Sequence, residues 1–487
     1  MIRGRGSAAN PRVRRWPRLV AAGLVIAALW TVAGAQLRFG PEFQVNSVTA
    51  GDQAYPAACR DRQGNLVIAW EGRGVDGSGN GIQIARYGFD GMTSASAQAN
   101  THTEGHQQLP AVACAPAGGV LAVWESNGQD GDDYGIVGRR FDGPVAAQGD
   151  EFVVNAETAD RQRAPAACGD DDGNFVVVWQ SYGQDGDGYG VFGQRFDGSA
   201  NRLGGEFQIN TVTANSQTRP AVACGAEGEF VVVWESGAQD GDGYGVFGQR
   251  FAPDGAKVGE EFPVNTVTEG TQQLAAVAAA SSGDFVVVWE SYDGQDGDGY
   301  GIFGQRFAST GERQGTEFQV NTATQFNQQK PSIGAAANGD FTVAWSSPHD
   351  DDCYGVFARR YDRTGTPREA EMLVNTFTDG VQGAISDEGR VVAVAGDASV
   401  VVWQSGGFIV PTQDGDGLGV FAQRFVPACA GDCSGDGAVG IAELITGVNI
   451  LLGTELATGC AAADTDAGGT VTVAEMIAAV ISALNGC

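Results

Sequence analysis

The most regular feature of the chain is a short apolar run that ends in tryptophan and recurs seven times. The tryptophans are Trp70, Trp124, Trp179, Trp234, Trp289, Trp345 and Trp403, and successive separations are 54, 55, 55, 55, 56 and 58 residues. A typical run, residues 230–234, reads Phe-Val-Val-Val-Trp. It is apolar on both faces of a strand, so each predicted sheet needs cover on both sides. The repetition indicates that neighbouring copies provide this cover.

Two series of polar residues recur with the same period as the tryptophans. In each copy an asparagine is followed seven positions later by a glutamine. The asparagines are Asn46, Asn100, Asn155, Asn210, Asn265, Asn321 and Asn375, and the glutamines are Gln53, Gln107, Gln162, Gln217, Gln272, Gln328 and Gln382. Turn residues divide the fourth copy into four expected strands, at 206–210, 220–224, 230–234 and 245–251. Stacked four-stranded units of ~50 residues predict an all-β fold, a seven-bladed β-propeller over residues 41–425.

The phase of the repeats predicts how the ring closes. The first copy opens with a strand at residues 43–46, and the last ends with a strand at residues 420–425. We therefore expect the N-terminal strand to be the outermost strand of the seventh blade, which removes an open sheet edge. The alternative, an open solenoid, needs polar capping repeats. The sequence shows no such caps.

Repetition of the polar residues in every copy favours a structural role for them. A residue needed once for chemistry should break the symmetry, so we interpret the Asn and Gln series as capping turns between blades rather than as a ligand-binding ring at the channel mouth. A matching arginine series is interpreted as blade-edge partners of the acidic loops. It comprises Arg86, Arg140, Arg195, Arg250, Arg306, Arg360 and Arg424.

An acidic loop separates the last two strands of most copies. It reads Gln-Asp-Gly-Asp-Gly-Tyr-Gly at residues 184–190, 239–245 and 295–301. Carboxylates on a glycine-rich turn are candidate Ca²⁺ ligands, here Asp185, Asp187, Asp240, Asp242, Asp296 and Asp298. The alternative is a solvated β-turn without metal. These loops resemble those of large secreted bacterial repeat proteins and, more loosely, the calcium loops of integrin-type propellers, which have more acidic positions.

Four cysteines occupy matching places in the first four copies: Cys59, Cys114, Cys168 and Cys224. Alanine replaces them at Ala279 and Ala335. Stacked sheets lie ~10 Å apart, beyond the ~7 Å limit between bridged Cα atoms. We therefore expect small buried side chains here and no disulfides.

Residues 426–487 follow a different pattern of loops and helices. Residues 432–443 and 464–475 each fit a twelve-residue EF-hand loop. The predicted Ca²⁺ positions are Asp432, Ser434, Asp436, Ala438 and Glu443 in the first loop, and Asp464, Asp466, Thr470 and Glu475 in the second. Gly468 stands where an oxygen ligand is expected, so the second site should bind more weakly. Helices are expected at residues 441–452 and 473–484.

The two loop-helix units resemble the type I dockerin module. This resemblance implies calcium binding and docking onto a cohesin-like partner or a cell-surface component. The chain departs from the family pattern in having Glu at loop position 12, and Ile441-Ala442 and Val473-Ala474 at the partner-reading positions. The module also holds Cys429, Cys433, Cys460 and Cys487, which should form disulfides in one of three pairings.

The N-terminus predicts a secreted protein, and the net charge argues against one class of partner. Residues 1–35 contain six arginines, an apolar run at 19–32 and Ala-Gly-Ala at 33–35, the pattern of a cleaved signal peptide. An uncleaved membrane anchor is the alternative. A net charge of −30 argues against nucleic acid as a partner. After cleavage no membrane segment remains in the sequence.

Three functions compete. The main hypothesis is a secreted, non-catalytic, calcium-binding scaffold for extracellular binding or adhesion; the alternative is a polysaccharide-degrading propeller hydrolase with a dockerin tag. A structural surface-layer component is the third. No Ser-His-Asp or zinc-ligand spacing involves the three histidines, His102, His106 and His349, so no catalytic residue is predicted. Residues 349–353 and 406–411 depart most from the repeat, and each is either a candidate ligand site or the result of sequence drift.

Overall fold

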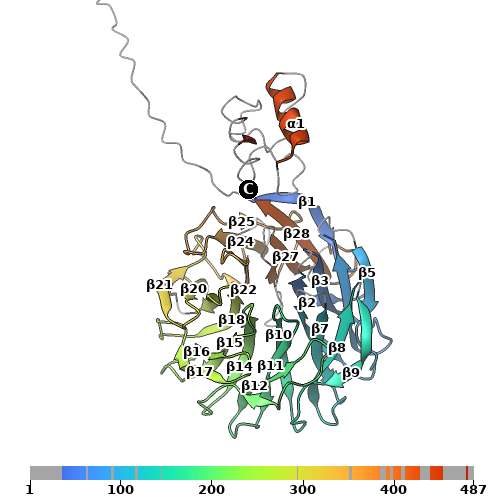
Figure 1. Ribbon diagram of the computed structural model, residues 1–487, viewed down its shortest axis with the longest axis vertical. Helices are drawn as coiled ribbons and strands as arrows, with labels where there is room; N and C mark the ends of the chain where they lie inside the picture. The colour runs from blue at the N-terminus through green and yellow to red at the C-terminus, as the bar shows by residue number, and fades with distance from the viewer. Residues whose placement is uncertain are drawn as a thin grey trace, which may run out of the picture. The chain divides into compact units, whose positions relative to one another are not determined.

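The computed structural model describes residues 36–61, 64–88, 93–115, 119–143, 145–292, 294–349, 354–383, 391–394, 399–406, 412–427 and 439–452, together with Met476, Ala479 and Val480. All of them belong to one compact unit, residues 34–487. Within it, seven four-stranded antiparallel sheets are arranged around a common axis (Figure 1). The predicted seven-bladed β-propeller is confirmed. Among the described residues, no helix combines the length and apolarity needed to cross a membrane.

The first strand of each blade lies next to the axis, where it contacts the first strands of both neighbouring blades. These inner strands are β2 (Gln53–Arg60), β6 (Gln107–Cys114), β10 (Gln162–Gly169), β14 (Gln217–Cys224), β18 (Gln272–Ala279), β22 (Gln329–Ala335) and β26 (Val391–Val394). The second strands carry the tryptophans. They are β3 (Leu66–Arg73), β7 (Val120–Asn127), β11 (Phe175–Tyr182), β15 (Phe230–Gly237), β19 (Phe285–Ser291), β23 (Phe341–Ser347) and β27 (Ser399–Ser405).

The third and fourth strands complete each blade toward the outside. The third strands are β4 (Asn80–Tyr87), β8 (Tyr134–Asp142), β12 (Tyr189–Phe196), β16 (Tyr244–Phe251), β20 (Gly301–Phe307), β24 (Gly355–Tyr361) and β28 (Gly419–Pro427). The outer strands are β5 (Thr93–Gln98), β9 (Ala146–Val153), β13 (Phe207–Gln208), β17 (Lys257–Pro263), β21 (Arg313–Gln319), β25 (Met372–Leu373) and β1 (Gln36–Gln44).

The N-terminal strand closes the ring as the repeat phase predicts. β1 pairs antiparallel with β28, so the seventh sheet has the order β1-β28-β27-β26. The Oδ1 of Asn46 accepts a 2.8 Å hydrogen bond from the N–H of Val420, which ties the start of the propeller to its end. Chain ends that are bonded to one another leave no free strand edge at this junction.

The hydrophobic core is divided into layers between blades. One layer packs Val231 and Val233 of the fourth blade against Trp289 and Phe303 of the fifth. Trp289 is fully buried. This confirms that neighbouring sheets cover both apolar faces of each second strand.

Two faces of the propeller differ in chemistry, and we name them after it. The acidic rim contains the Asp-Gly loops between second and third strands, such as residues 183–188, and the starts of the inner strands. The disulfide rim contains the ends of the inner strands.

The expectation of unpaired cysteines is wrong. Cys59 bonds to Cys114, and Cys168 to Cys224, with Cα–Cα distances of 5.6 Å in both pairs. The ~10 Å spacing holds for stacked sheets, whereas the inner strands of a propeller converge on the axis. Equivalent positions there come close enough for the two sulfurs to bond.

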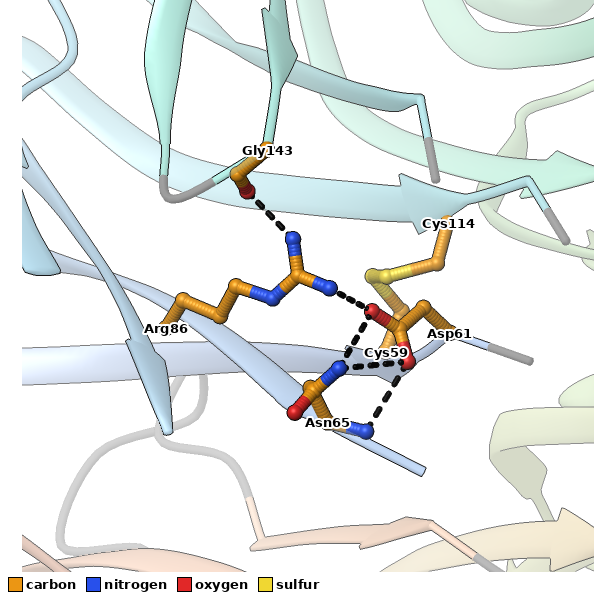
Figure 2. The surroundings of a disulfide bond; sticks show 6 residues. All are labelled: Cys59, Asp61, Asn65, Arg86, Cys114 and Gly143. Atoms are coloured by element: carbon orange, nitrogen blue, oxygen red, sulfur yellow. Dashed lines mark hydrogen bonds and ion pairs between the residues drawn. A yellow bond between two sulfur atoms is a disulfide. The ribbon is translucent and has the colours of Figure 1, made fainter. Parts of the chain in front are cut away.

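The arginine series is also corrected. Arg86 bonds the carboxylate of Asp61 and the carbonyl oxygen of Gly143, which lies in the turn of the next blade (Figure 2). Arg195 likewise donates to the carbonyl oxygen of Pro253. The register pairs Arg195 with Val176 near the start of its second strand, whereas the acidic loop follows the other end. Arg250 and Arg306 bond the next blade in the same way, so these four arginines join blades at the disulfide rim and do not partner the acidic loops.

Candidate functional site

The repeated Asn and Gln residues form a buried scaffold at the acidic rim. Asn210 accepts a hydrogen bond from the N–H of Val191 at 2.8 Å. Its Nδ2 donates to Oδ2 of Asp185 at 2.9 Å and to Oε1 of Gln217 at 3.0 Å. Asn210 and Gln217 are almost fully buried. The structural interpretation of this series is confirmed, since a satisfied buried amide holds the loop, the third strand and the next inner strand together.

The acidic loops use both of their carboxylates within the protein. Asp185 bonds Asn210, and Oδ2 of Asp187 accepts from the N–H of Asn215 at 2.9 Å. The same two bonds recur at Asp240, Asp242, Asp296 and Asp298. In the described part of the chain, no three His, Cys, Asp or Glu side chains gather as a metal site would require. Calcium at these loops stays a prediction.

The C-terminal module is described mainly through its first helix, α1 (Ile441–Leu451), which confirms the expected helix. Oε2 of Glu443 accepts a hydrogen bond from the N–H of Gly440 at 2.6 Å, so this predicted ligand caps the helix in the structure. The other predicted ligands, Asp432, Ser434, Asp436, Ala438, Asp464, Asp466, Thr470 and Glu475, lie outside the described residues. The four cysteines of the module do so as well.

A bulge shapes the start of the inner strands. In β14, the register with β15 shifts between Thr218 and Ala221, and Arg219 adopts a left-handed conformation with φ of 48°. Proline follows Arg219 and has no N–H for the ladder. The corresponding residues with positive φ in other blades are Tyr55, Leu109, Ala164, Leu274 and Lys330.

The bulge frees one backbone N–H in each of these blades to bond the blade before it. The N–H of Leu274 donates to Oε1 of Glu235 at 2.6 Å, and that of Lys330 to Oε2 of Glu290 at 2.9 Å. Between the third and fourth blades, Gln180 accepts from Arg219 at 2.8 Å. The accepting residue always follows the repeated tryptophan. These bonds hold the backbone of each bulge in place. Because the donor is a backbone N–H, they do not depend on which side chain the bulge residue carries.

The side chains at the bulge break the seven-fold symmetry. Two positions follow each repeated glutamine, and their residues differ from blade to blade. The pairs are Ala54-Tyr55, Gln108-Leu109, Arg163-Ala164, Thr218-Arg219, Gln273-Leu274 and Gln329-Lys330. Cationic side chains appear in the third, fourth and sixth blades, and Lys330 is one of only two lysines in the chain.

Seven of these positions line a cavity of about 530 Å³ at the acidic-rim end of the central channel: Leu109, Arg163, Ala164, Thr218, Arg219, Leu274 and Lys330. Its wall combines small apolar residues of the inner strands with Arg163, Arg219 and Lys330. Its polar lining also includes Glu125, Gln180, Thr218, Ser332 and Tyr244, the last from the start of β16. Concave sites with a few convergent polar groups are typical ligand sites, so this cavity is the candidate functional site.

Three buried carboxylates lie next to the cationic residues of the cavity wall: Glu125, Glu235 and Glu290. Burial raises the pKa of Glu125, Glu235 and Glu290 above their ordinary values, and Arg163 and Arg219 oppose this effect at Glu125 and Glu235. Nη2 of Arg163 lies 3.0 Å from Oε2 of Glu125, and Nη1 of Arg219 lies 3.2 Å from Oε2 of Glu235. The guanidinium of Arg163 also lies 5.1 Å from the ring centre of Tyr134.

In both ion pairs the arginine side chain is partly exposed and the glutamate side chain is buried. The side chains of Arg163 and Arg219 are 26% and 41% exposed, whereas their glutamates are at most 1% exposed. Both oxygens of Glu125 already accept hydrogen bonds, from Ala164 and from Gln108 and Arg163. The groups that face a ligand are therefore predominantly hydrogen-bond donors.

Sequence reasoning missed these residues because it looked for asymmetry in insertions. Residues 350–353 and 407–411 of the two irregular segments lie outside the described residues. The signal that locates the cavity was present in the repeats: the two positions after each glutamine vary, while the glutamine, tryptophan and asparagine do not.

Comparison with known proteins relates the chain to others by fold. No family model and no curated protein sequence matches it. A solved ulvan lyase of polysaccharide lyase family PL25 superposes with a TM-score of 0.51 at 11% identity, covering 79% of this chain and 95% of the lyase. The same kind of lyase bound to -[GlcA(1-4)Rha3S]- gives 0.50 at 10% identity, over 79% and 95%. At this identity the similarity establishes the fold.

Further neighbours are more distant. A Dyadobacter fermentans protein of unknown function has a TM-score of 0.48 at 13% identity, covering 80% of this chain and 99% of its own. The α-L-arabinanase of Penicillium chrysogenum, solved with arabinobiose, has a TM-score of 0.41 at 14% identity, covering 64% and 93%.

Proposed function

We propose that this protein binds a polysaccharide at the channel cavity and recognises an acidic group of the sugar there. The observation that carries the proposal is the set of Arg163, Arg219 and Lys330 around one cavity, at the positions where the repeat varies. A residue that contacts one asymmetric ligand has no reason to recur in every blade. The repeated residues around it have structural roles.

The hydrogen-bonding character of the wall selects the ligand class. The partly exposed guanidinium and ammonium groups donate, and the carboxylates behind them have their oxygens occupied. Carboxylate and sulfate groups are pure acceptors that match a planar guanidinium, which makes acidic sugars better ligands than neutral ones. The negatively charged acidic loops lie around the rim and would repel an acidic sugar at close range. Physiological salt screens charges beyond about 8 Å, so this repulsion is weak for a group seated in the cavity.

The fold neighbours are consistent with this ligand class. A uronate and a sulfated sugar occur in the glycan bound to the solved ulvan lyase. That glycan belongs to the lyase, and it supports a polysaccharide here only as an analogy of fold.

A second candidate function is cleavage of the bound polysaccharide. It is favoured over a purely non-catalytic scaffold by neighbours that are polysaccharide-degrading enzymes. In an elimination, a cation on the uronate carboxylate would acidify the adjacent C–H, a base would take that proton, and the glycosidic C–O bond would break as a C=C bond forms. A tyrosine would donate a proton to the departing oxygen. Tyr134 and Tyr244 are the tyrosines near these cations. Burial raises the pKa of Tyr134, which favours the protonated, donating form.

The remaining proposal concerns location and attachment. The two disulfides fit an extracellular protein, as the leader sequence predicts. We further propose that residues 426–487 form a Ca²⁺-dependent, dockerin-like attachment module for a cohesin-like protein or a cell surface. Its support is the EF-hand spacing together with an apolar stripe of α1 and the residue after it, in which Ile441, Ile445, Val448 and Leu452 are exposed.

A glycan array probed with the full secreted chain tests the proposed ligand. We expect binding to acidic polysaccharides and weaker or no binding to neutral ones. Lys330→Leu should reduce affinity at least tenfold, which corresponds to the loss of one charge-assisted contact. Leucine occupies the same position in the second and fifth blades, so the fold should accept it. Lys257→Leu, which changes the other lysine, on outer strand β17, is the matched control.

Two outcomes would contradict the proposal: binding of neutral glycans alone, or equal affinity of the Lys330 and Lys257 variants. Cleavage is measured separately. Elimination would produce an ultraviolet-absorbing unsaturated sugar, hydrolysis would produce reducing ends without it, and intact polymer would leave a binding protein.

A further inference from the structure

Exposed aromatic side chains gather on the acidic rim next to the cavity. At the end of β11, Tyr182 is 49% exposed, and its ring centre lies 5.2 Å from that of Tyr189. At the end of β19, Tyr292 is 43% exposed, and its ring centre lies 4.6 Å from that of Tyr300. Large exposed aromatic rings in pairs are unusual on a soluble surface and mark interaction sites.

The blade between these two pairs differs in one residue. The position of Tyr182 and Tyr292, three after the tryptophan, is Gly237 in the fourth blade. A side chain added at Gly237 would approach Cε1 of Tyr244 to 3.6 Å. Tyr244 therefore has no aromatic partner on its own blade at this place and lines the cavity instead.

A third aromatic position continues the series toward the sixth blade. Phe326 is 62% exposed, and its ring centre lies 6.1 Å from that of His349. Its N–H donates to Oδ2 of Asp298, and the adjacent Asn327 accepts from the N–H of Tyr300. Phe326 thus stands beside the Tyr292 and Tyr300 pair. We call Tyr182, Tyr189, Tyr244, Tyr292, Tyr300 and Phe326 the aromatic arc.

The arc passes the cavity rather than lying elsewhere on the protein. The N–H of Tyr182 donates to the carbonyl oxygen of Arg161, two residues before Arg163 of the cavity wall. The N–H of Tyr292 donates to Thr271, three residues before Leu274 of the same wall. Aromatic residues therefore flank the cavity on the third and fifth blades, with Tyr244 between them.

We propose that the aromatic arc holds sugar units of a polysaccharide chain beyond the unit seated in the cavity. This inference rests on the proposed function and specifies the ligand as a polymer rather than a short saccharide. Aromatic rings present flat apolar faces that pack against the C–H faces of sugar rings, while sugar hydroxyl groups remain free for the neighbouring polar loops. Such contacts add to affinity only for a ligand long enough to reach them.

The experiment compares ligand length in wild type and in arc variants of the full chain. The probes are polygalacturonate, alginate and a sulfated galactan, each as polymer and as purified dimer, measured by calorimetry. Tyr182→Ala combined with Tyr292→Ala should weaken polymer binding about three- to tenfold per ring and leave dimer binding unchanged. Both side chains are half exposed, so their loss should not disturb the fold. Val258→Ala, an exposed apolar residue of β17, is the control.

The outcomes separate the two proposals. Wild-type binding of polymer and dimer with equal affinity would overturn the arc while leaving the cavity intact. Equal polymer affinity of the double variant and Val258→Ala would do the same. If no acidic probe binds the wild-type protein, the proposed function fails, and the arc fails with it.

Discussion

Glu42 and Thr376 are joined by two hydrogen bonds although 334 residues separate them in the sequence. Oε2 of Glu42 accepts from the N–H of Thr376 at 2.6 Å and from its Oγ1 at 2.9 Å. The other carboxylate oxygen accepts from Gln413 of the seventh blade. One side chain from β1 thus binds both the linker before the last blade and the acidic loop of that blade.

Replacement of Glu42 should therefore weaken ring closure in particular. We expect Glu42→Ala to lower the free energy of unfolding by about 1–3 kcal/mol, since it removes three hydrogen bonds to a charged carboxylate, two from the exposed Thr376 and one from the part-buried Gln413. Amide exchange in β1 and β28 should accelerate, because local opening at the closing blade becomes easier. Glu261→Ala is the control, as Glu261 makes equivalent bonds to the N–H and hydroxyl of Thr211 and to Gln239 within the continuous part of the chain. Equal exchange in the two variants would show that Glu42 has no special role in closure.

The buried glutamates should make stability depend on pH. Burial raises the pKa of Glu290, so the folded protein keeps this proton to higher pH than the unfolded chain does. Its contribution to stability is therefore complete below about pH 4, the ordinary range for a glutamate, and is lost as pH rises through the raised pKa of the folded state. Glu290→Gln should lose this dependence and be the more stable protein at neutral pH. Gln180 and Gln404 already accept the same backbone bond in other blades.

Melting temperature measured against pH for wild type and Glu290→Gln checks this expectation. A difference between the two proteins that stays constant across the range would contradict it. Glu290→Leu serves as a second comparison, because it leaves the N–H of Lys330 without its acceptor and should destabilise at every pH by about 1–3 kcal/mol.

The disulfides should stabilise the propeller substantially. Each closes a loop of 55 or 56 residues, for which loss of chain entropy in the unfolded state predicts about 4 kcal/mol. Cys59→Ala with Cys114→Ala should lower the denaturation midpoint accordingly. Peptide mass spectrometry without reduction should recover the linked pairs Cys59–Cys114 and Cys168–Cys224. Free thiols at these positions in the secreted protein would refute the pairing.

Calcium should organise the C-terminal module. Titration of the full chain should reveal two sites with affinities of ~0.1 to 1 mM, the first tighter because its loop offers more oxygen ligands. Asp436→Asn should remove the tighter site, and Asp466→Asn the weaker. Heat that survives both substitutions would indicate binding by the propeller loops. No heat at millimolar calcium would exclude the EF-hand interpretation.

The sequence predicted the blades, their number and their closure because each depends on repeated patterns. Trp234, Asn210 and Gln217 occupy fixed places in every copy, and a periodic series reveals its fold without knowledge of distances. The phase of the series then placed the N-terminal strand. The paired cysteines escaped prediction because their separation depends on distance from the axis, which no sequence pattern encodes.

The cavity was predictable only in part. The rule that functional residues should break the symmetry applies to Arg219 and Lys330, which line the cavity at variable positions. Their importance depends on the bulge that brings their positions to the channel, and the bulge became visible only in the backbone. The arginine series was misplaced for a related reason: Arg195 and the acidic loop are close in sequence but lie at opposite ends of one hairpin.

At the bulges, backbone hydrogen bonds hold the blades together, while the side chains at the same positions are free to vary and to determine ligand specificity. Each bond uses a backbone N–H and an acceptor on the preceding blade, so Leu109, Ala164, Arg219 and Lys330 fill equivalent places without altering the ring. Duplicated blades could therefore diverge at these positions while the frame stayed intact. In evolution the bulge residue of each blade could change independently and alter the contacts with the ligand. The same positions offer a protein engineer a set of sites for changing what the ring binds.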